Sequence, residues 1–419
     1  MDILLQKLFE PARWEYAIEV GVEKDMKKGE LRKMCSPEFK RTLCSAILDD
    51  KYDIAPPHEA HIPKENGEFR TVYVNEQIDR VVLSIINDLL FEMFPDMIHE
   101  SCKSYQHGVG TGKVVTSLSA EIQKAKGREI GWKADLSKYF DSVPIEYINN
   151  VFDEIDRKIG KSHVTDLVRR YYNSDLCFDI QGNLIHHYAS LKQGCAVGSF
   201  LADVMLYDID NKLSNMNGIY VRYSDDTCFV GNDYKLAKTT MEQELSKMSM
   251  KLNPKKVEML SSERWFKFLG FNIKGSQITL SKSRVKTFQK EIEKRTIKRA
   301  RGTFKSSLND VNNFLYKGDG QYSWATSVLS VINVDKDIDT LNDFVLDALR
   351  ATQTGKKRIG GLGSVNTLPD STIVRGIGRN VTNNKRKTEK EVSGYSSIRC
   401  MRNALITDRN AYKALVRMM

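Results

Sequence analysis

Residues 220–230, which read YVRYSDDTCFV, place two adjacent aspartates between two runs of strand-forming side chains. Aromatic and β-branched residues favour strands, and a tight turn between two such runs makes a hairpin. The pattern therefore predicts a hairpin that holds Asp225 and Asp226 at its tip. Because adjacent like charges repel each other, a fold retains them most readily where cations neutralise them.

A third carboxylate comes from residues 130–141, IGWKADLSKYFD. Ile130, Trp132 and Ala134 alternate on one face of a predicted strand, which leaves Asp135 at the end of the strand, where it can reach an open cleft. Taken alone, such an aspartate is usually a helix cap or a turn residue. Together with the YSDD hairpin it supplies hard oxygen ligands, which suit magnesium or manganese and not zinc. Three carboxylates can hold two divalent ions about 3.5 to 4 Å apart, the arrangement that catalyses nucleotidyl transfer.

The composition agrees with an intracellular protein that binds a polyanion. The chain has 419 residues and 41% hydrophobic content, enough for two to four subdomains, and 64 basic against 54 acidic residues give a net charge of +10. The seven cysteines are scattered, without a CxxC pair, and are read as reduced thiols. No apolar run approaches the roughly 18 residues of a membrane span, and the start lacks signal-peptide features, so a cytoplasmic location is expected.

Helical and strand-like periodicities interleave without a regular βαβ repeat, which predicts an α+β fold. Apolar residues at helical spacing predict helices over 79–93, 148–155 and 202–213. Strands are predicted at 60–64, 68–74, 128–135, 219–223 and 227–230. The first two flank Asn66-Gly67, which is a strong hairpin turn signal.

Residues 282–305 carry ten basic side chains and two acidic ones. A helix with that charge would track a phosphate backbone, and the alternative is a solvated helix face. After about residue 355 the chain becomes glycine-rich and basic, which indicates a loop-rich appendage before a final short helix at 408–418.

The chain resembles reverse transcriptases over roughly residues 55 to 275. Residues 135–141 resemble the D-x-x-x-[FY]-F-D motif of bacterial and group II intron enzymes, and 223–226 resemble the Y-x-D-D box. Residues 193–203 resemble the Q-G-x-x-x-S-P-x-L-A-N motif, although Gly198, Ser199 and Asp203 stand where serine, proline and asparagine are usual.

Three further blocks extend the resemblance. Residues 62–70 resemble the fingers hairpin I-P-K-x-x-G-x-x-R, 252–256 resemble L-N-x-x-K, and 268–270 resemble the F-L-G primer grip. Read without the family, Lys64 and Arg70 would be solvated strand ends, and the aromatic run around 268–270 would be a core strand.

The resemblance implies a role for each matching residue. The metal site, for two Mg²⁺ ions or for Mn²⁺ in their place, would comprise Asp135, Leu136, Asp225 and Asp226, of which the three aspartates are catalytic. The nucleotide-binding set would be Lys64, Arg70, Phe140, Gln193, Gly194 and Lys256, with Lys64 and Arg70 on the β- and γ-phosphates. The nucleic-acid-binding set would be Phe268, Leu269, Gly270, Lys290, Lys294, Arg295, Lys298 and Arg299.

The resemblance also implies a right-hand polymerase fold, with an antiparallel palm sheet plus helices and a helical thumb. The expected parts are an N-terminal helical extension (1–60), fingers (61–130), palm (131–275, with a fingers insertion at about 150–190), thumb (276–350) and a basic C-terminal extension (351–419). The expected partners are an RNA template, a DNA product and deoxynucleoside triphosphates, with no membrane. Neither a zinc endonuclease domain, a ribonuclease H carboxylate set nor the NAxxH and VTG retron signatures is recognisable. The chain therefore looks most like stand-alone bacterial reverse transcriptases that serve antiviral defence with a structured non-coding RNA.

Two other classes compete with an RNA-directed DNA polymerase. An RNA-dependent RNA polymerase usually carries a polar residue five positions after the first aspartate, where this chain has Phe140, whose ring would collide with a ribose 2′-hydroxyl. A catalytically silent RNA-binding or splicing-helper protein would have little reason to keep every carboxylate, and all three are present.

Overall fold

The computed structural model describes residues 2–23, 28–64, 67–106, 108–125, 129–187, 189–299, 303–318, 323–354, 366–367, 374–375 and 394–419. The chain forms two compact units. The first unit comprises Met1–Gly108 and Gly131–Glu258, and the second comprises Val109–Ile130 and Met259–Met419. Each unit is described by itself below.

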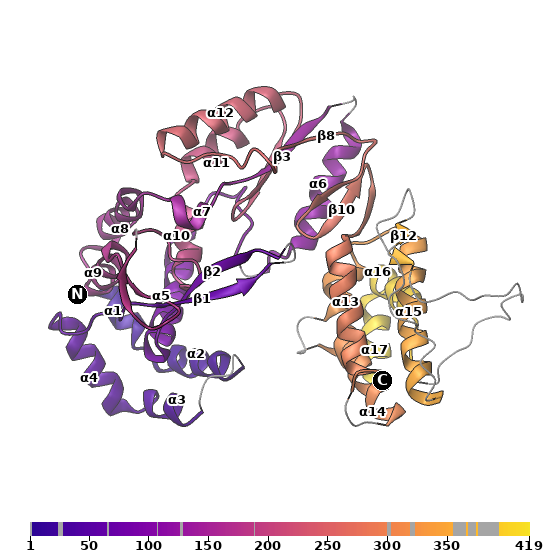
Figure 1. Cartoon of the computed structure of the whole chain (residues 1–419), viewed down its shortest axis with the longest axis horizontal. Helices are drawn as coiled ribbons and strands as arrows, with labels where there is room; N and C mark the ends of the chain where they lie inside the picture. The colour runs from indigo at the N-terminus through magenta and orange to yellow at the C-terminus, as the bar shows by residue number, and fades with distance from the viewer. Residues whose placement is uncertain are drawn as a thin grey trace, which may run out of the picture. The chain divides into compact units, whose positions relative to one another are not determined.

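The first unit begins with short helices that pack around a longer one. Ser36 caps α4 by accepting a hydrogen bond from the Phe39 amide, and a proline follows at the first helical position. The helix predicted at 79–93 is confirmed as α5, whose apolar face is buried. The helices are α1 (Ile3–Leu8), α2 (Pro11–Glu23), α3 (Lys28–Met34), α4 (Pro37–Leu48) and α5 (Gln77–Met93) (Figure 1).

One sheet of the first unit is built on the predicted N-terminal hairpin. Strands β1 and β2 pair antiparallel from His58–Val74 to Pro63–Phe69, which confirms the two strands predicted around the Asn-Gly turn. The sheet order is β2-β1-β4-β5, and helices α8 and α9 precede β4 along the chain. The bounds are β1 (His58–Pro63), β2 (Phe69–Val74), α8 (Ile145–Ile159), α9 (His163–Asn173), β4 (Leu176–Phe178) and β5 (Leu184–His186). Figure 1 labels β1, β2, α8 and α9.

The second sheet carries the predicted carboxylates. Strands β6 (Ile219–Tyr223) and β7 (Asp226–Val230) form an antiparallel hairpin, and β7 also pairs antiparallel with β3 (Gly131–Asp135). Strand β8 (Glu258–Leu260) completes the sheet order β6-β7-β3-β8. Antiparallel sheets mixed with helices confirm the predicted α+β class.

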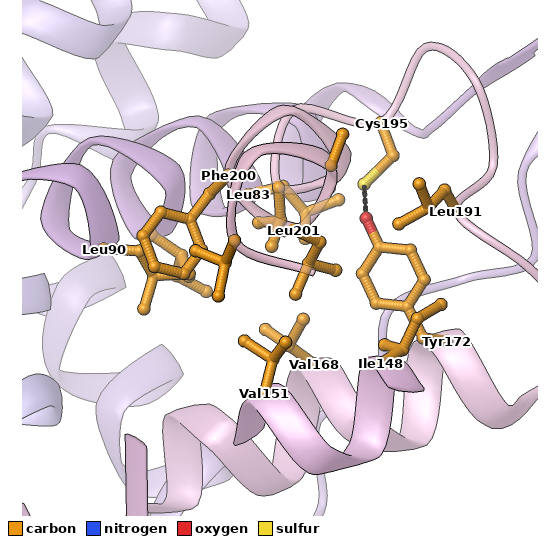
Figure 2. Close-up of a cluster of buried hydrophobic side chains, with 14 of the residues drawn as sticks. Leu83, Leu90, Ile148, Val151, Val168, Tyr172, Leu191, Cys195, Phe200 and Leu201 are labelled. Atoms are coloured by element: carbon orange, nitrogen blue, oxygen red, sulfur yellow. Dashed lines mark hydrogen bonds between the residues drawn. The ribbon is translucent and has the colours of Figure 1, made fainter. Parts of the chain in front are cut away.

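The core of the first unit lies between helices and the sheet of β6, β7, β3 and β8, which we call the carboxylate sheet. Trp132 of β3 is completely buried, as is Phe200. Figure 2 shows side chains from α5, α8 and α9 converging around Phe200 and Leu201, and Tyr172 donating a hydrogen bond of 3.2 Å to the Cys195 sulfur. Burial of such apolar side chains stabilises the fold by about 1.5–3 kcal/mol each.

The helix predicted at 202–213 is wrong, because the structure has two helices there. Helix α10 (Gly198–Val204) ends before Met205, and α11 (Tyr207–Ser214) begins after Leu206. In a continuous helix the carbonyls of Ala202 and Asp203 would accept bonds from the next turn. Instead they accept hydrogen bonds from the buried Arg222 guanidinium, at 3.2 and 2.7 Å. The apolar spacing is retained, but the buried donors stop the helix.

The second unit contains a small sheet and a set of helices. Its three-stranded sheet has the order β11-β10-β9. The remaining strands β12 (Asn366–Thr367) and β13 (Val374–Arg375) form a separate pair. The other elements are α6 (Thr111–Lys124), β9 (Phe266–Phe268), β10 (Phe271–Lys274), β11 (Gln277–Leu280), α13 (Lys282–Arg295), α14 (Phe304–Asn312), the π-helical turns η2 (Asn313–Lys317) and η3 (Ala325–Leu329), α15 (Asp335–Thr354), α16 (Ile398–Thr407) and α17 (Arg409–Met418).

The basic helix predicted over 282–305 is shorter than expected. Helix α13 ends at Arg295, and Thr296 follows with its hydroxyl turned back to the Ile292 carbonyl at 2.7 Å. The final helix predicted at 408–418 is confirmed as α17, capped by Asp408. The predicted glycine-rich appendage from about 355 to 393 lies outside the described residues except for β12 and β13. Within the described parts, no helix is both long and apolar enough to cross a membrane.

Candidate active site

The strand register brings the three predicted carboxylates to one edge of the carboxylate sheet. Asp135, the last residue of β3, lies directly opposite Asp226, the first residue of β7. Ser224 adopts a left-handed φ of 58° in the two-residue turn before β7. The Leu136 amide donates to the Asp225 carbonyl at 3.0 Å, which fixes this turn against the end of β3.

Lys256 reaches the same place from the segment that follows α12 (Tyr234–Lys247). Its ammonium nitrogen lies 2.5 Å from Asp135 Oδ2, and the Asn253 amide donates to the Asp135 carbonyl at 2.8 Å. Leu252 also forms a bridge with Leu136. The structure therefore joins the L-N-x-x-K segment to the carboxylates, although the two are far apart in sequence.

Burial and mutual repulsion shift the acidity of the hairpin aspartates. The pKa of Asp226 is raised to about 6, first by burial and then by the charges of Asp225 and Asp135. Burial and the charge of Asp135 also raise the pKa of Asp225, while the positive charges of Lys256 and Arg70 oppose that rise. A site that disfavours its own negative charges is one that an added cation stabilises.

The chemistry of this donor set fits a hard divalent cation, although the side chains are not arranged as a finished metal site. Carboxylate oxygens are the ligands that Mg²⁺ and Mn²⁺ prefer. Among the described residues, no group of three acidic, histidine or cysteine side chains is positioned to hold a metal ion. The Asp135 carboxylate instead binds the Lys256 ammonium, a cation of the protein itself.

A buried polar network lies beneath the hairpin and was missed by the sequence analysis. Arg222, completely buried, donates to Asp210 at 2.6 to 3.0 Å. The Ser104 hydroxyl donates to Asp203 Oδ1 at 2.5 Å and accepts from the Ser224 amide at 2.9 Å. The network thereby holds the turn that carries Asp225. Asp203 and Arg222 each interrupt a run of apolar residues, a signal that predicts a buried charge with a partner.

The structure distinguishes the two aromatic residues that follow Asp135. Tyr139 is 2% exposed, and its hydroxyl donates to the Ala202 carbonyl at 2.6 Å. Phe140 is half-buried and lines a small depression together with Tyr73 and Asp141. Of the pair, Phe140 is therefore the ring that remains accessible to a ligand.

Gln193 and Gly194 lie against the N-terminal hairpin. The Tyr73 amide of β2 donates to the Gln193 carbonyl at 2.7 Å. Gly194 has a φ of +111°, and a side-chain carbon there would lie 2.7 Å from the Tyr73 carbonyl, so only glycine fits without strain. Lys64 and Arg70 are exposed at the turn end of the same hairpin, and Lys64 lies 3.6 Å from Glu68.

The predicted nucleic-acid-binding residues all belong to the second unit. Phe268 ends β9 and is buried, whereas Leu269 and Gly270 form the tight turn into β10. Lys290 and Lys294 are exposed on α13. The other three basic residues form ion pairs within the unit: Arg295 with Glu291, Lys298 with Glu293 and Arg299 with Asp310.

Comparisons with known proteins found several similar proteins. The family model described as "Reverse transcriptase (RNA-dependent DNA polymerase)" matches residues 62–273. The Retron Ec48 reverse transcriptase of Escherichia coli is 23% identical over 285 residues, which cover 65% of this chain and 65% of that protein. The putative COX1/OXI3 intron 2 protein of Saccharomyces cerevisiae is 26% identical over 176 residues, covering 41% and 19%.

Among solved structures, apo telomerase from Candida tropicalis matches with a TM-score of 0.44 and 14% identity, over 71% of this chain and 56% of that one. The chain thus spans less than two thirds of the length of each of these three proteins.

Proposed function

This chain belongs to the reverse transcriptase (RNA-dependent DNA polymerase) family, and on that premise we propose that it copies an RNA template into DNA. The observation that carries the proposal is the register that sets Asp135 opposite Asp226 at the hairpin of Asp225. Three carboxylates from two distant segments meet there beside Lys256. A catalytically silent RNA-binding protein would have no need to bring three carboxylates together. Their mutual repulsion costs stability, and such a protein would not use them.

The proposed metal ligands are Asp135, Asp225 and Asp226, together with the main chain at Leu136. Two divalent ions bound there would lower the pKa of the attacking primer hydroxyl and stabilise the leaving oxygen. The family generally uses divalent metal ions, and Mg²⁺ is the ion proposed here, with Mn²⁺ as a substitute.

Cationic side chains of the first unit would bind the triphosphate of the incoming nucleotide. Lys256 already lies at the carboxylates, and the positive charge of Arg70 already acts on Asp225. Arg70 offers a forked guanidinium and Lys64 a compact ammonium for the outer phosphates. We propose that Gln193 and Gly194 face the nucleotide and template base, a placement supported by their contact with Tyr73.

The proposed product is DNA. A ring at Phe140 beneath the incoming sugar excludes a 2′-hydroxyl by steric overlap. The burial of Tyr139, which is hydrogen-bonded to the Ala202 carbonyl, supports Phe140 as the ring that faces the ligand. This choice favours a DNA polymerase over an RNA-dependent RNA polymerase.

We further propose that the protein acts in the bacterial cytoplasm, in antiviral defence, on a structured non-coding RNA. The resemblance to stand-alone defence-associated enzymes supports this role, as does the similarity to a retron reverse transcriptase. The positive net charge of the chain suits an RNA partner.

Primer extension with the double variant Asp225→Ala/Asp226→Ala tests the proposed reaction. We expect no DNA synthesis in magnesium or manganese, together with an intact fold, because both side chains are half-buried at a turn and contribute little to the core. The matched control is Asp208→Ala, which removes an exposed acid from α11. Nucleotide incorporation by the purified double variant would refute the assignment.

A further inference from the structure

The second unit contains an open groove whose aromatic walls have no role in the sites described above. It has a volume of about 860 Å³, and its walls include Lys294, Arg295, Asn313, Phe314, Trp324 and Ser327. We call it the aromatic groove. Its volume lies in the range of sites that hold small organic ligands, about 300–1,000 Å³.

Two aromatic rings in the groove are held by their neighbours. Trp324 packs on the buried Phe288, with ring centroids 4.6 Å apart. The Arg295 guanidinium lies over Phe314, 4.3 Å from the ring centroid. Trp324 and Phe314 are both half-buried, so each ring is anchored on the core while part of it stays accessible. Rings fixed in this way lose little conformational entropy when a flat ligand stacks on them.

The charge of the groove suits an anion attached to that flat ligand. Three cationic residues and one acidic residue line it. Arg299 pairs with the acidic residue, Asp310, at 2.6 Å, and Arg295 pairs with Glu291. Lys294 is exposed and forms no ion pair within the described parts of the chain. Its ammonium is therefore available to a phosphate.

The backbone of both walls departs from regular helix. Asn313 and Phe314 begin the π-helical turn η2, and Trp324 precedes the π-helical turn η3, which contains Ser327. Such turns cost stability and occur frequently at functional sites. Two such turns contribute residues to this one groove, which favours a functional role for it.

We propose that the aromatic groove binds an unpaired nucleobase of a single-stranded nucleic acid, stacked on Trp324, with the adjacent phosphate on Lys294. The proposal deepens the proposed function and rests on it, since it names a second contact of the polymerase with its template or product. Base stacking on aromatic rings is tolerant of sequence. The groove would hold a strand end or loop that is not base-paired.

The test compares labelled oligothymidylate and oligouridylate with an abasic strand of equal length, in the Asp225→Ala/Asp226→Ala protein. We expect base-bearing strands to bind about 5- to 150-fold more tightly than the abasic strand, which corresponds to ~1–3 kcal/mol of stacking. Trp324→Leu should bring the ratio of the two affinities, base-bearing over abasic, close to one. Trp324→Phe should preserve most of this ratio. The preferred strand, RNA or DNA, identifies the source of the base.

Two exposed variants keep the test independent of folding. Ser327→Leu fills the groove without removing a packed ring and should also lower the ratio. Lys294→Gln should weaken base-bearing and abasic strands alike, and the control Lys413→Gln, on α17, should weaken neither. A wild-type ratio near one, or a ratio unchanged in Ser327→Leu, would overturn the proposal. Failure of primer extension by the wild-type enzyme would instead refute the proposed polymerase activity. The two outcomes are distinguishable because the binding assay needs no catalysis.

Discussion

Replacing Arg222 with methionine should strongly destabilise the first unit. Arg222 and Asp210 are both completely buried, and the guanidinium also satisfies the carbonyls of Ala202 and Asp203. Methionine has a similar length but donates no hydrogen bond, so the variant leaves the Asp210 carboxylate buried without its cation. Breaking a buried ion pair from one side typically costs about 3–5 kcal/mol. That is a large part of the roughly 5–15 kcal/mol that holds a domain together.

A double variant separates the cost of the orphaned charge from the value of the pair. Arg222→Met combined with Asp210→Leu removes both charges of this pair, a replacement that is often neutral or even stabilising, and leaves only Asp203, 3.9 Å from the guanidinium, without its cation. We therefore expect the double variant to recover much of the lost stability, although the Tyr220 hydroxyl then loses its acceptor.

Hydrogen exchange of the β6 and β7 amides measures the opening free energy of this part of the molecule directly. We expect the opening free energy to be highest in the wild type, lower in the double variant and lowest in Arg222→Met. The wild type and Arg222→Met should differ by about 3–5 kcal/mol. A single variant within about 1 kcal/mol of wild type, or a double variant less stable than the single one, would show that Arg222 does not depend on Asp210 as described.

Two other predictions concern Asp203 and Phe140. Burial raises the pKa of Asp203 to about 6, above an unfolded value of about 4, so the folded state favours the protonated acid. The stability that this group contributes is present below about pH 4 and is lost as the pH rises through 6, by about 3 kcal/mol for a shift of ~2 units. In denaturant titrations across that range, Asp203→Asn should remove this component, and profiles of equal slope for variant and wild type would contradict it. Phe140→Val should admit ribonucleotides in primer extension while the thermal melt stays close to that of wild type. A stable variant that still refuses ribonucleotides would show that another residue selects the sugar.

The carboxylate hairpin could be predicted from sequence because its information is local. Strand-forming residues flank Asp225 and Asp226 directly, and the alternation before Asp135 is visible in a few residues. The pairing of β3 with β7 follows from the expectation that Asp135 and the hairpin aspartates lie at one site. The metal ligands, the nucleotide contacts and the five-part division remain predictions.

The errors arose where a distant donor decided the local structure. The break between α10 and α11 depends on Arg222, which comes later in the chain. Its guanidinium donates hydrogen bonds to the carbonyls of Ala202 and Asp203. The ion pair of Arg299 with Asp310 likewise depends on a side chain of the next helix, which sequence periodicity cannot place. Whether the basic residues of this segment bind phosphates stays a prediction.

The pairing of Asp135 with Asp226 also restricts how this chain can change in length. A strand points successive side chains to opposite faces, so one residue inserted into β3 or β7 would turn an aspartate away from its partners and put a core side chain in its place. The loops in the long stretch between β3 and β7 have no such parity to keep, unlike β6, which also lies in that stretch and pairs with β7. Insertions and deletions should therefore accumulate in its surface loops over evolution, whereas the two strands should change only by substitution.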